Sequence, residues 1–302
     1  MPFDWTSRFE QERPYLFAVA YRMLGSASEA DDILQEAWLR VRTSEEVPRN
    51  ARAFLTTVVV RLCLDAAKSA RARRETYVGP WLPEPLLDAP SSDDAHAGAP
   101  AEERVGIQES VSMALLVVLE TLSPLERAAF LLREVFDYEF EEISLCLGRS
   151  EAACRQLFHR AKEHVLAKRS RFKPSAADAD RLVHGFMLAV ATGDLSSVES
   201  LLADDCVVTS DSGGRVSAAR KPVIGKDHVA KFFVGLAKKA PPDLSLTFEH
   251  VNGQPAFVLR AFGRLNNVAV FEVVDGAIKR IRIVLNPEKL ARFERALVAR
   301  AP

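Results

Sequence analysis

Apolar residues recur at helical spacing through the first quarter of the chain. Phe9, Leu16 and Met23 fall on one side of a first helix, which the dipeptide "GS" then ends. A second helix is predicted to begin near Ser28, because acidic residues occupy its first turn, where the helix dipole favours them. A third pattern, "ARAFLTTVVVRLCLDAAKSARARR", begins apolar and ends strongly basic. Together these patterns predict a helical domain over residues 1–78.

The composition changes after this helical part. The stretch "GPWLPEPLLDAPSSDDAHAGAPAEE" is rich in Pro, Ala, Ser and acidic residues, and it contains too little apolar surface to order itself. Residues 79–105 are therefore predicted to be a linker. Within it, "WLPEP" allows two interpretations. It is either a stiff spacer or a docking peptide that lays Trp81 and Leu82 on a neighbouring surface, with the prolines lowering the entropy cost.

Helical spacing resumes over residues 106–173. Ser123, Pro124 and Glu126 form a helix start in which Ser is the cap, Pro takes the first helical position and Glu closes a capping box. Further on, "FEEISLCLGRSEAACRQLFHRAKEHV" contains two helical patterns joined by a Gly-Arg-Ser turn. At about 100° per residue, the second of these helices has an apolar side and a basic side. A short glycine turn before such a helix indicates a helix-turn-helix unit. The apolar side comprises Ala153, Cys154, Leu157, Phe158, Ala161 and Val165.

The basic side of this helix supplies candidate DNA contacts. Arg155, Gln156 and His159 are placed to reach base edges, and Glu151 belongs to the same outward stripe. A plain solvated face is the alternative interpretation. The flanking cations suited to phosphate are Arg149, Arg160 and Lys162. A second basic cluster ends the third helix, where cations also favour the helix dipole. It comprises Arg61, Lys68, Arg71, Arg73 and Arg74.

The pattern changes again in residues 174–302. Two helical patterns broken at Gly193 are followed by short alternating segments such as "LSLTFEHV" and "IKRIRIVL". Asn252-Gly253 and Asp275-Gly276 separate such segments, and these dipeptides favour tight hairpins. Helices followed by an antiparallel meander predict a separate α+β domain.

Composition and charge limit how the chain could bind nucleic acid and in which compartment it is expected to act. The chain has 302 residues and a net charge of −1, whereas a protein that binds DNA by itself is usually basic. A nucleic-acid role must therefore use local basic segments, or a partner that supplies the affinity. The four cysteines lie among apolar neighbours without a CxxC motif, which indicates reduced thiols in a cytosolic compartment. Neither a secretory signal nor a membrane span is recognised, so we expect a soluble cytoplasmic protein.

A zinc site is the alternative use of the cysteines. Cys146, Cys154, His159 and His164 match no zinc framework in their spacing, and buried thiols are expected instead. The sequence therefore predicts neither a metal ion nor a cofactor.

Two stretches resemble the extracytoplasmic-function sigma factors of the sigma-70 family. The segment "ADDILQEAWLRV" resembles part of sigma region 2, and "LSPLERAAFLLREVFDYEFEEISLCLGRSEAACRQLFHRAKEHV" resembles sigma region 4. The remainder resembles a SnoaL-like domain. This resemblance implies a multidomain fold: two all-α sigma domains, the second with the helix-turn-helix, and an α+β cone domain with a curved antiparallel sheet. It implies a promoter-specificity subunit of RNA polymerase rather than an enzyme.

The resemblance assigns surfaces to partners. An exposed patch on the second helix would dock on the clamp coiled coil of core RNA polymerase. The basic third helix would hold the promoter −10 element, and the loop of residues 48–53 is the expected place of a −10 base pocket. The helix-turn-helix would read the −35 element. The core-binding patch comprises Asp32, Gln35, Glu36 and Leu39.

One subgroup of these sigma factors, with a fused SnoaL-like domain, carries three short motifs. This chain has "WLPEP" at residues 81–85, "DSGGR" at 211–215 and "NPEKL" at 286–290, with Ser212 in place of Gly and Glu288 in place of Asp. The resemblance implies that the domain contacts region 2 and the linker, and thereby regulates the DNA-binding modules. The residues expected to make these regulatory contacts are Trp81, Leu82, Pro83, Glu84, Pro85, Asp211, Gly213, Gly214, Arg215, Asn286, Pro287, Glu288, Lys289 and Leu290.

The alternative function is a DNA-binding regulator that acts without polymerase and uses its SnoaL-like domain as a small-molecule sensor or enzyme. An enzyme would need acid–base groups that converge in the cone. His184, Asp205 and His250 are the available groups.

Overall fold

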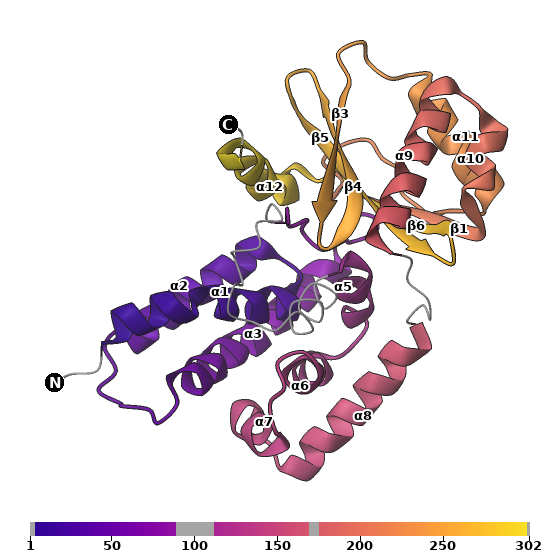
Figure 1. The fold of residues 1–302 in the computed structure, drawn as a ribbon. Coiled ribbons are helices and arrows are strands. Elements are labelled where there is room, and N and C mark those ends of the chain that lie inside the picture. Colours follow the sequence, from indigo (N-terminus) through magenta and orange to yellow (C-terminus); the bar gives the residue numbers. More distant parts are fainter. Residues whose placement is uncertain (1–3, 89–111, 169–174, 301–302) are drawn as a thin grey trace. The chain divides into compact units, whose positions relative to one another are not determined.

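The chain folds into two compact units, Met1–Thr76 with Leu115–Arg169, and Tyr77–Ala114 with Ser170–Pro302. The structure is a computed structural model that describes residues 4–88, 112–168 and 175–300, with the backbone alone over residues 69–75 (Figure 1). The first part of the predicted linker, up to residue 88, therefore belongs to the same unit as the C-terminal domain. Residues 89–105 of that linker lie outside the described residues.

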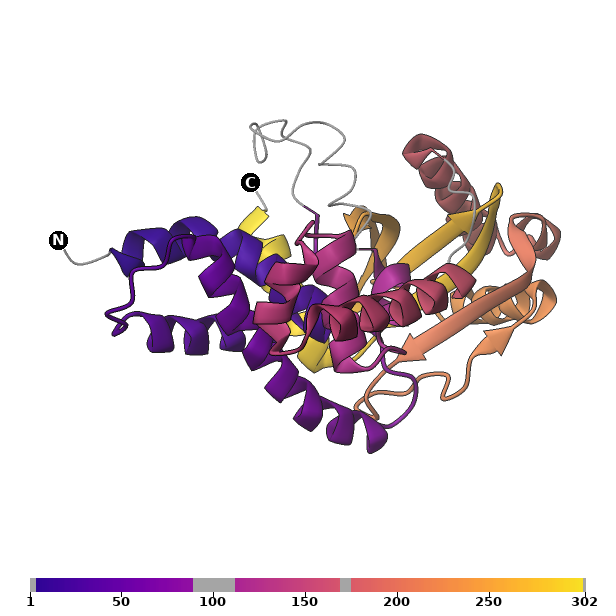
Figure 2. The ribbon, with the colours of Figure 1, turned by 90° about the horizontal axis from the view of Figure 1, so that it is seen from below.

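The first unit is all helical, as the apolar spacing predicts. Ser26 rather than Ser28 caps the second helix, because its Oγ accepts from the backbone N–H of Glu29 at 3.1 Å. The capping box of Ser123 and Glu126 is confirmed. In Figure 2 the magenta helices lie against the indigo and violet helices of the same unit. The helices are α1 (Trp5–Leu24), α2 (Ala27–Val41), α3 (Ala51–Glu75), α5 (Met113–Leu119), which starts in the other unit, α6 (Pro124–Glu134), α7 (Phe140–Leu147) and α8 (Glu151–Lys168).

The second unit is one six-stranded sheet with helices packed against it (Figure 1). The strand order is β2-β1-β6-β5-β4-β3, and consecutive strands from β3 to β6 pair antiparallel. The strands are β1 (Leu202–Asp211), β2 (Val223–Ile224), β3 (Ser245–Val251), β4 (Gln254–Ala261), β5 (Arg264–Val274) and β6 (Ala277–Val284). The helices are α9 (Ala176–Thr192), α10 (Leu195–Ser200), α11 (Lys226–Ala237) and α12 (Pro287–Arg300).

The expected fold class is confirmed, with one correction to the sheet. The sheet is mixed rather than antiparallel, because β1 and β6 pair in parallel, with Val208 opposite Ile281. The Asn-Gly and Asp-Gly dipeptides of the sequence predict only the antiparallel pairing of consecutive strands. They carry no signal for a pairing between strands that lie far apart in the sequence.

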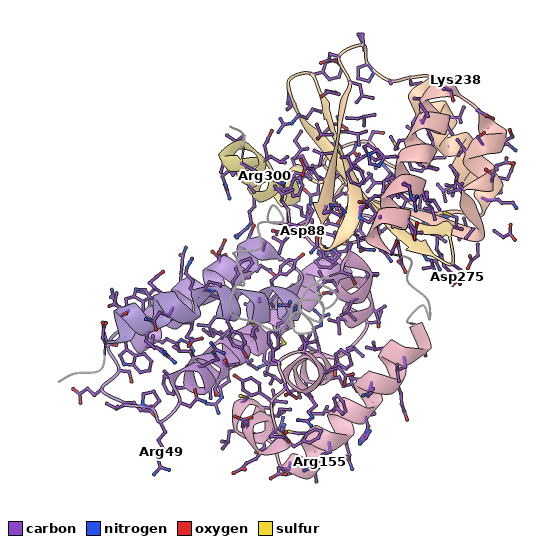
Figure 3. The ribbon with its side chains drawn as sticks, viewed as in Figure 1. Arg49, Asp88, Arg155, Lys238, Asp275 and Arg300 are labelled. Atoms are coloured by element: carbon purple, nitrogen blue, oxygen red, sulfur yellow. The ribbon has the colours of Figure 1, made fainter. Side chains whose placement is uncertain are left out.

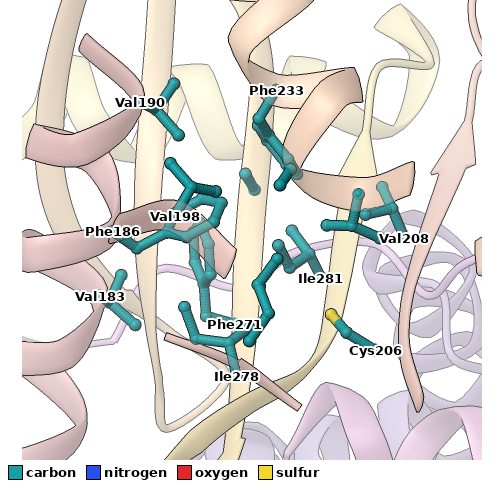
Figure 4. Close-up of a cluster of buried hydrophobic side chains, with 14 of the residues drawn as sticks. Val183, Phe186, Val190, Val198, Cys206, Val208, Phe233, Phe271, Ile278 and Ile281 are labelled. Atoms are coloured by element: carbon teal, nitrogen blue, oxygen red, sulfur yellow. The ribbon is translucent and has the colours of Figure 1, made fainter. Parts of the chain in front are cut away.

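A buried apolar cluster fills the space between the sheet and helices α9, α10 and α11 (Figure 4). The ring of Phe186 meets two other rings edge-on. Its centroid lies 5.1 Å from that of Phe233 and 5.8 Å from that of Phe271. Aromatic edge-to-face packing of this kind supplies much of the buried apolar area of a small core. The interior of the cone is therefore occupied by hydrophobic side chains.

The predicted hairpins at Asn252-Gly253 and Asp275-Gly276 are both present. Their first residues have φ of 54° and 50°, in the left-handed region that Asn and Asp tolerate. A third hairpin at Phe262-Gly263 was not signalled, because Phe at φ 54° is an uncommon turn residue. Among the described residues, no helix has the length and apolarity needed to span a membrane.

Candidate functional site

The turn between α7 and α8 has the geometry that the sequence predicts. Gly148 ends α7 in a left-handed conformation with φ 60°, and Ser150 Oγ accepts from the Ala153 N–H at 3.3 Å. The predicted inner face of α8 is buried or half-buried. The outer stripe is exposed and comprises Glu151, Arg155, Gln156, His159 and Arg160.

The central cation of this stripe is held in place by its own neighbours. Arg155 Nη2 lies 3.1 Å from Glu151 Oε2, and its guanidinium lies 4.3 Å from the centroid of the Phe140 ring. Both contacts lie on the exposed side of the helix, where Arg155 is labelled in Figure 3. Its role in DNA binding stays a prediction.

Two further cations of the predicted −35 surface pair with carboxylates of α6. Arg160 Nε lies 3.4 Å from Glu126 Oε1, and Lys162 Nζ lies 3.1 Å from Glu134 Oε2. Exposed pairs of this kind are weak in water and are easily exchanged for another anion. Arg149, in the turn, is exposed.

The predicted core-binding patch is one exposed strip on α2. Asp32, Gln35, Glu36 and Leu39 all lie on the surface, and the side chain of Leu39 is 50% exposed although it is apolar. Glu36 pairs with Arg40 at 2.8 Å, one turn further along the helix.

The basic cluster of α3 is only partly described. Arg61 donates to the carbonyls of Leu145 at 2.8 Å and Cys146 at 3.2 Å, in the last turn of α7. Lys68 is exposed and pairs with Asp65. Positions 71, 73 and 74 lie on α3, but the side chains of Arg71, Arg73 and Arg74 lie outside the described residues.

The helices α1 and α3 form an extended interface with α6 and α7, which sequence reasoning missed. The hydroxyl of Tyr138 donates to Thr56 Oγ1 at 2.9 Å and meets the hydroxyl of Tyr15 at 3.3 Å. Burial raises the pKa of both tyrosines. Thr57 Oγ1 lies 3.1 Å from Cys146 Sγ in the same interface.

Arginine side chains close both ends of this interface. Arg127, buried on α6, donates to the carbonyl of Met23 at 2.7 Å, in the last turn of α1. Arg61 caps the last turn of α7 in the same way. The carbonyls of a last helical turn have no partner in their own helix, and the helix dipole favours a cation there. An arginine of α6 thus caps the end of α1, and an arginine of α3 caps the end of α7.

Asp211 is the centre of the predicted regulatory contacts. Its side chain is fully buried at the end of β1, and it accepts from the hydroxyl of Tyr77 at 2.5 Å and the backbone N–H of Leu82 at 2.7 Å. Lys289 Nζ lies 2.7 Å from its Oδ2. Asn286 donates to the Tyr77 hydroxyl at 2.9 Å. We call Tyr77, Asp211, Asn286 and Lys289 the Asp211 cluster, and residues 77–88 the linker arm.

The linker arm also packs its aromatic side chains on the buried cation. Lys289 Nζ lies 4.1 Å from the ring centroid of Trp81 and 5.0 Å from that of Tyr77. Cation–π contacts of a desolvated ammonium are favourable. Leu82 and residues 83–85 are buried. The three sequence motifs therefore meet in one place, within the second unit.

The glycines of "DSGGR" allow the close approach of the linker arm. A Cβ on Gly213 would lie 2.6 Å from Asn286 Nδ2, and a Cβ on Gly214 would lie 3.1 Å from Val78. Both glycines have positive φ, whereas Ser212, the departure from the family pattern, does not. Ser212 is therefore accommodated without strain. Glu288, the other departure, pairs with Arg215 at 2.7 Å and keeps the charge.

The candidate acid–base groups do not all converge. The rings of His184 and Phe248 have centroids 4.1 Å apart, and His250 Nε2 lies 3.1 Å from Asp180 Oδ1. Asp205 lies on β1 and pairs with Lys279. Both histidines lie beside Phe248, whose ring centroid is 5.4 Å from that of His250, whereas Asp205 belongs to another part of the sheet. The four cysteines are buried and free, and no metal-binding group of three side chains occurs within the described residues.

Comparisons with known proteins agree with this organisation. The model of Sigma-70 region 2 matches residues 8–73, that of Sigma-70, region 4 matches residues 112–165, and that of the SnoaL-like domain matches residues 183–281. The ECF RNA polymerase sigma factor SigJ of Mycobacterium tuberculosis is 38% identical over 293 residues, which cover 94% of this chain and 92% of SigJ. The probable ECF RNA polymerase sigma factor SigI of the same species is 30% identical over 94% of each chain.

A solved structure is similar to this chain over the same share of its length. The crystal structure of the extracytoplasmic function sigma factor SigJ of M. tuberculosis matches with a TM-score of 0.75 and 37% identity, over 94% of this chain and 98% of that one. The chain belongs to the extracytoplasmic function sigma factors of RNA polymerase, with a SnoaL-like domain fused after region 4.

Proposed function

We propose that this sigma factor binds core RNA polymerase through α2, holds the promoter −10 element with α3 and reads the −35 element with α8. We further propose that its SnoaL-like domain modulates promoter use through the linker arm. The protein acts in the cytoplasm, together with polymerase and chromosomal DNA. The observation that supports the regulatory role is the buried Lys289–Asp211 pair. Asp211 also binds the backbone of Leu82, and this joins the chain that follows region 2 to the SnoaL-like domain.

The exposed strip on α2 is the proposed core contact. Replacing Asp32 and Glu36 together by Ala is expected to weaken binding to core polymerase roughly tenfold, because two charges of a complementary surface are lost. Titration of fluorescently labelled protein with core polymerase measures the affinity. The control is the paired change Glu45→Ala and Glu46→Ala, which removes the same charge from exposed positions elsewhere in region 2. Equal affinities of the two variants would exclude this strip.

The −35 contact is tested at Arg155. We expect Arg155→Ala to cost about 1–3 kcal/mol in binding to the preferred −35 sequence and to broaden sequence preference at one base pair. The matched variant is Lys162→Ala, a proposed phosphate contact on the same helix, which should weaken all sequences alike. A randomised promoter library, sequenced after binding of the holoenzyme, separates the two outcomes. A uniform loss for Arg155→Ala would make it a phosphate contact.

The −10 contact requires a rearrangement of Arg61. In the structure its guanidinium covers the carbonyls of α7, so it is engaged inside the protein. We propose that Arg61 exchanges these carbonyls for DNA phosphate when regions 2 and 4 separate. Lys68, which is exposed on the same helix, is a further proposed phosphate contact, as are the predicted Arg71, Arg73 and Arg74.

Run-off transcription tests the whole proposal. Core polymerase with this protein should transcribe a subset of a randomised promoter library, whereas core polymerase alone should not. Removing the residues after about 174 should change which templates are used or how much RNA they yield. The absence of RNA from every template would reject the sigma function. The enzyme alternative is less favoured, because Asp205 pairs with Lys279 in another part of the sheet than the two histidines.

A further inference from the structure

The β3–β4 turn holds the linker arm at a second place that the three motifs do not include. The backbone N–H of Leu86 donates to Asn252 Oδ1 at 3.0 Å, and the N–H of Asn252 donates back to the Leu86 carbonyl at 3.0 Å. Asp88 Oδ2 accepts from the Gly253 N–H at 2.8 Å, and the backbone N–H of Asp88 donates to the His250 carbonyl at 3.0 Å. The arm therefore adds a short antiparallel pairing to the free edge of β3, the outer strand of the sheet.

Asn252 differs from an ordinary hairpin residue. It is fully buried, whereas Asp275, the corresponding residue of the β5–β6 hairpin, is exposed with nearly the same φ. Both dipeptides satisfy the backbone of a tight turn equally well. The side chain of Asn252 therefore serves a contact outside its own hairpin. Asp88 and Asp275 are labelled in Figure 3.

The same turn also contacts the other end of the connecting chain. Gln254, the first residue of β4, accepts from the backbone N–H of Ala114 at 3.4 Å. Asp88 and Ser112 are 24 residues apart in the sequence. Residues 250–254 nevertheless bind the chain before this span, at Asp88, and after it, at Ala114. Fully extended, 24 residues span about 85 Å.

This length matches what promoter binding demands. The −10 and −35 elements lie about 25 base pairs apart, which is about 85 Å at ~3.4 Å per base pair. Regions 2 and 4 pack together in one unit of the structure. They must therefore separate before each can occupy its own element, and the connecting chain must lengthen.

We propose that the β3–β4 turn is an intramolecular binding site that holds both ends of the chain between regions 2 and 4, and so stores the length that promoter binding requires. The inference rests on the sigma function proposed above. On the region 2 side the arm is held by Asn252, by Asp88 and by the buried Asp211 cluster. We expect the region 4 side, held at Ala114, to open first. The SnoaL-like domain then stays with region 2.

The first experiment needs no polymerase. Asn252→Gly removes the amide that receives the linker arm and keeps a residue suited to positive φ, and Asp275→Gly is the matched change in the other hairpin. Hydrogen exchange of the full chain is measured by mass spectrometry on peptides covering residues 82–88. Exchange should rise about tenfold in Asn252→Gly and remain at the wild-type rate in Asp275→Gly. Asp88→Ala, which alters no residue of the sheet, should reproduce the rise. Wild-type exchange in both Asn252→Gly and Asp88→Ala would overturn the proposal.

The second experiment follows the separation of regions 2 and 4. The four native cysteines are buried, so fluorophores can be attached to Arg42→Cys and Leu166→Cys, two exposed positions. Energy transfer in the full chain should fall when core polymerase is added. The half-point should come at a roughly fivefold lower core concentration in Asn252→Gly than in Asp275→Gly, because release of the arm makes separation easier.

The outcomes distinguish the two proposals. If core polymerase binds but energy transfer does not change, or the two variants have equal half-points, the storage role is rejected. If core polymerase fails to bind any version, the sigma function is rejected. The hydrogen-exchange comparison still decides whether the turn holds the arm in that case.

Discussion

Asp211→Ala is expected to release the linker arm from the SnoaL-like domain. Lys289 would be left as a buried charge without its partner, and breaking a buried pair in this way costs about 3–5 kcal/mol. The hydroxyl of Tyr77 and the N–H of Leu82 would lose their acceptor at the same time. Hydrogen exchange of the peptide covering residues 77–85 should rise by at least about a hundredfold, the ratio that corresponds to roughly 3 kcal/mol.

Two further variants give this prediction its controls. Asp204→Ala removes a carboxylate from the same strand, but Asp204 is exposed and pairs with exposed Lys226, so no change in exchange is expected. Combining Asp211→Ala with Lys289→Met removes the stranded charge and should recover part of the protection. If Asp211→Ala behaves like Asp204→Ala, the buried pair does not hold the arm.

The sequence predicts those parts of the structure that depend on local pattern. The inner face of α8 follows from the positions of Cys154, Phe158 and Ala161, because helical periodicity alone decides which side of an amphipathic helix is buried. The hairpins at Asn252 and Asp275 follow from turn chemistry that is equally local. The three motifs of the Asp211 cluster were found by resemblance, since nothing in their spacing places residues 77–82 beside residues 211 and 286.

The interface between regions 2 and 4 could not be predicted in this way. Tyr15 and Tyr138 meet across 123 residues of sequence, and Thr57 and Cys146 across 89. Periodicity identifies an apolar face but not the element that covers it. Buried tyrosines are a weak signal, because a hydroxyl inside a protein requires a partner that the sequence does not identify. Arg61 shows the consequence, since its basic position suggested DNA while its present partners are helix carbonyls.

The reciprocal arginine caps make this interface specific for one arrangement. Arg61 of region 2 covers the last turn of α7, and Arg127 of region 4 covers the last turn of α1. Hydrophobic packing alone tolerates sliding of one helix pair on the other, whereas a guanidinium directed at particular carbonyls fixes the register. Separation of the regions exposes both helix ends to water, which can satisfy them. Opening of the interface would therefore leave neither helix end buried and unpaired.

Arg127→Met is expected to destabilise strongly the arrangement in which regions 2 and 4 pack against each other. Arg127 is buried, and burial lowers the pKa of its guanidinium to about 10, so it remains charged at neutral pH. It bonds Met23 O at 2.7 Å, Leu119 O at 2.9 Å and Glu120 Oε1 at 2.7 Å. Removing it takes away the ion pair with Glu120 and the bonds to the two carbonyls, and the expected loss is about 3–5 kcal/mol in the free energy of unfolding of the first unit.

Chemical denaturation followed by circular dichroism at 222 nm measures this loss, because the first unit is all helical. The matched variant is Arg160→Met, which removes the same charge from an exposed position of the same unit, where the pair with Glu126 contributes little. We also expect Arg127→Met to lower the core concentration needed to separate regions 2 and 4, since only the closed form contains the bond to Met23. A variant as stable as Arg160→Met would show that α1 and α6 are not joined through Arg127 in solution.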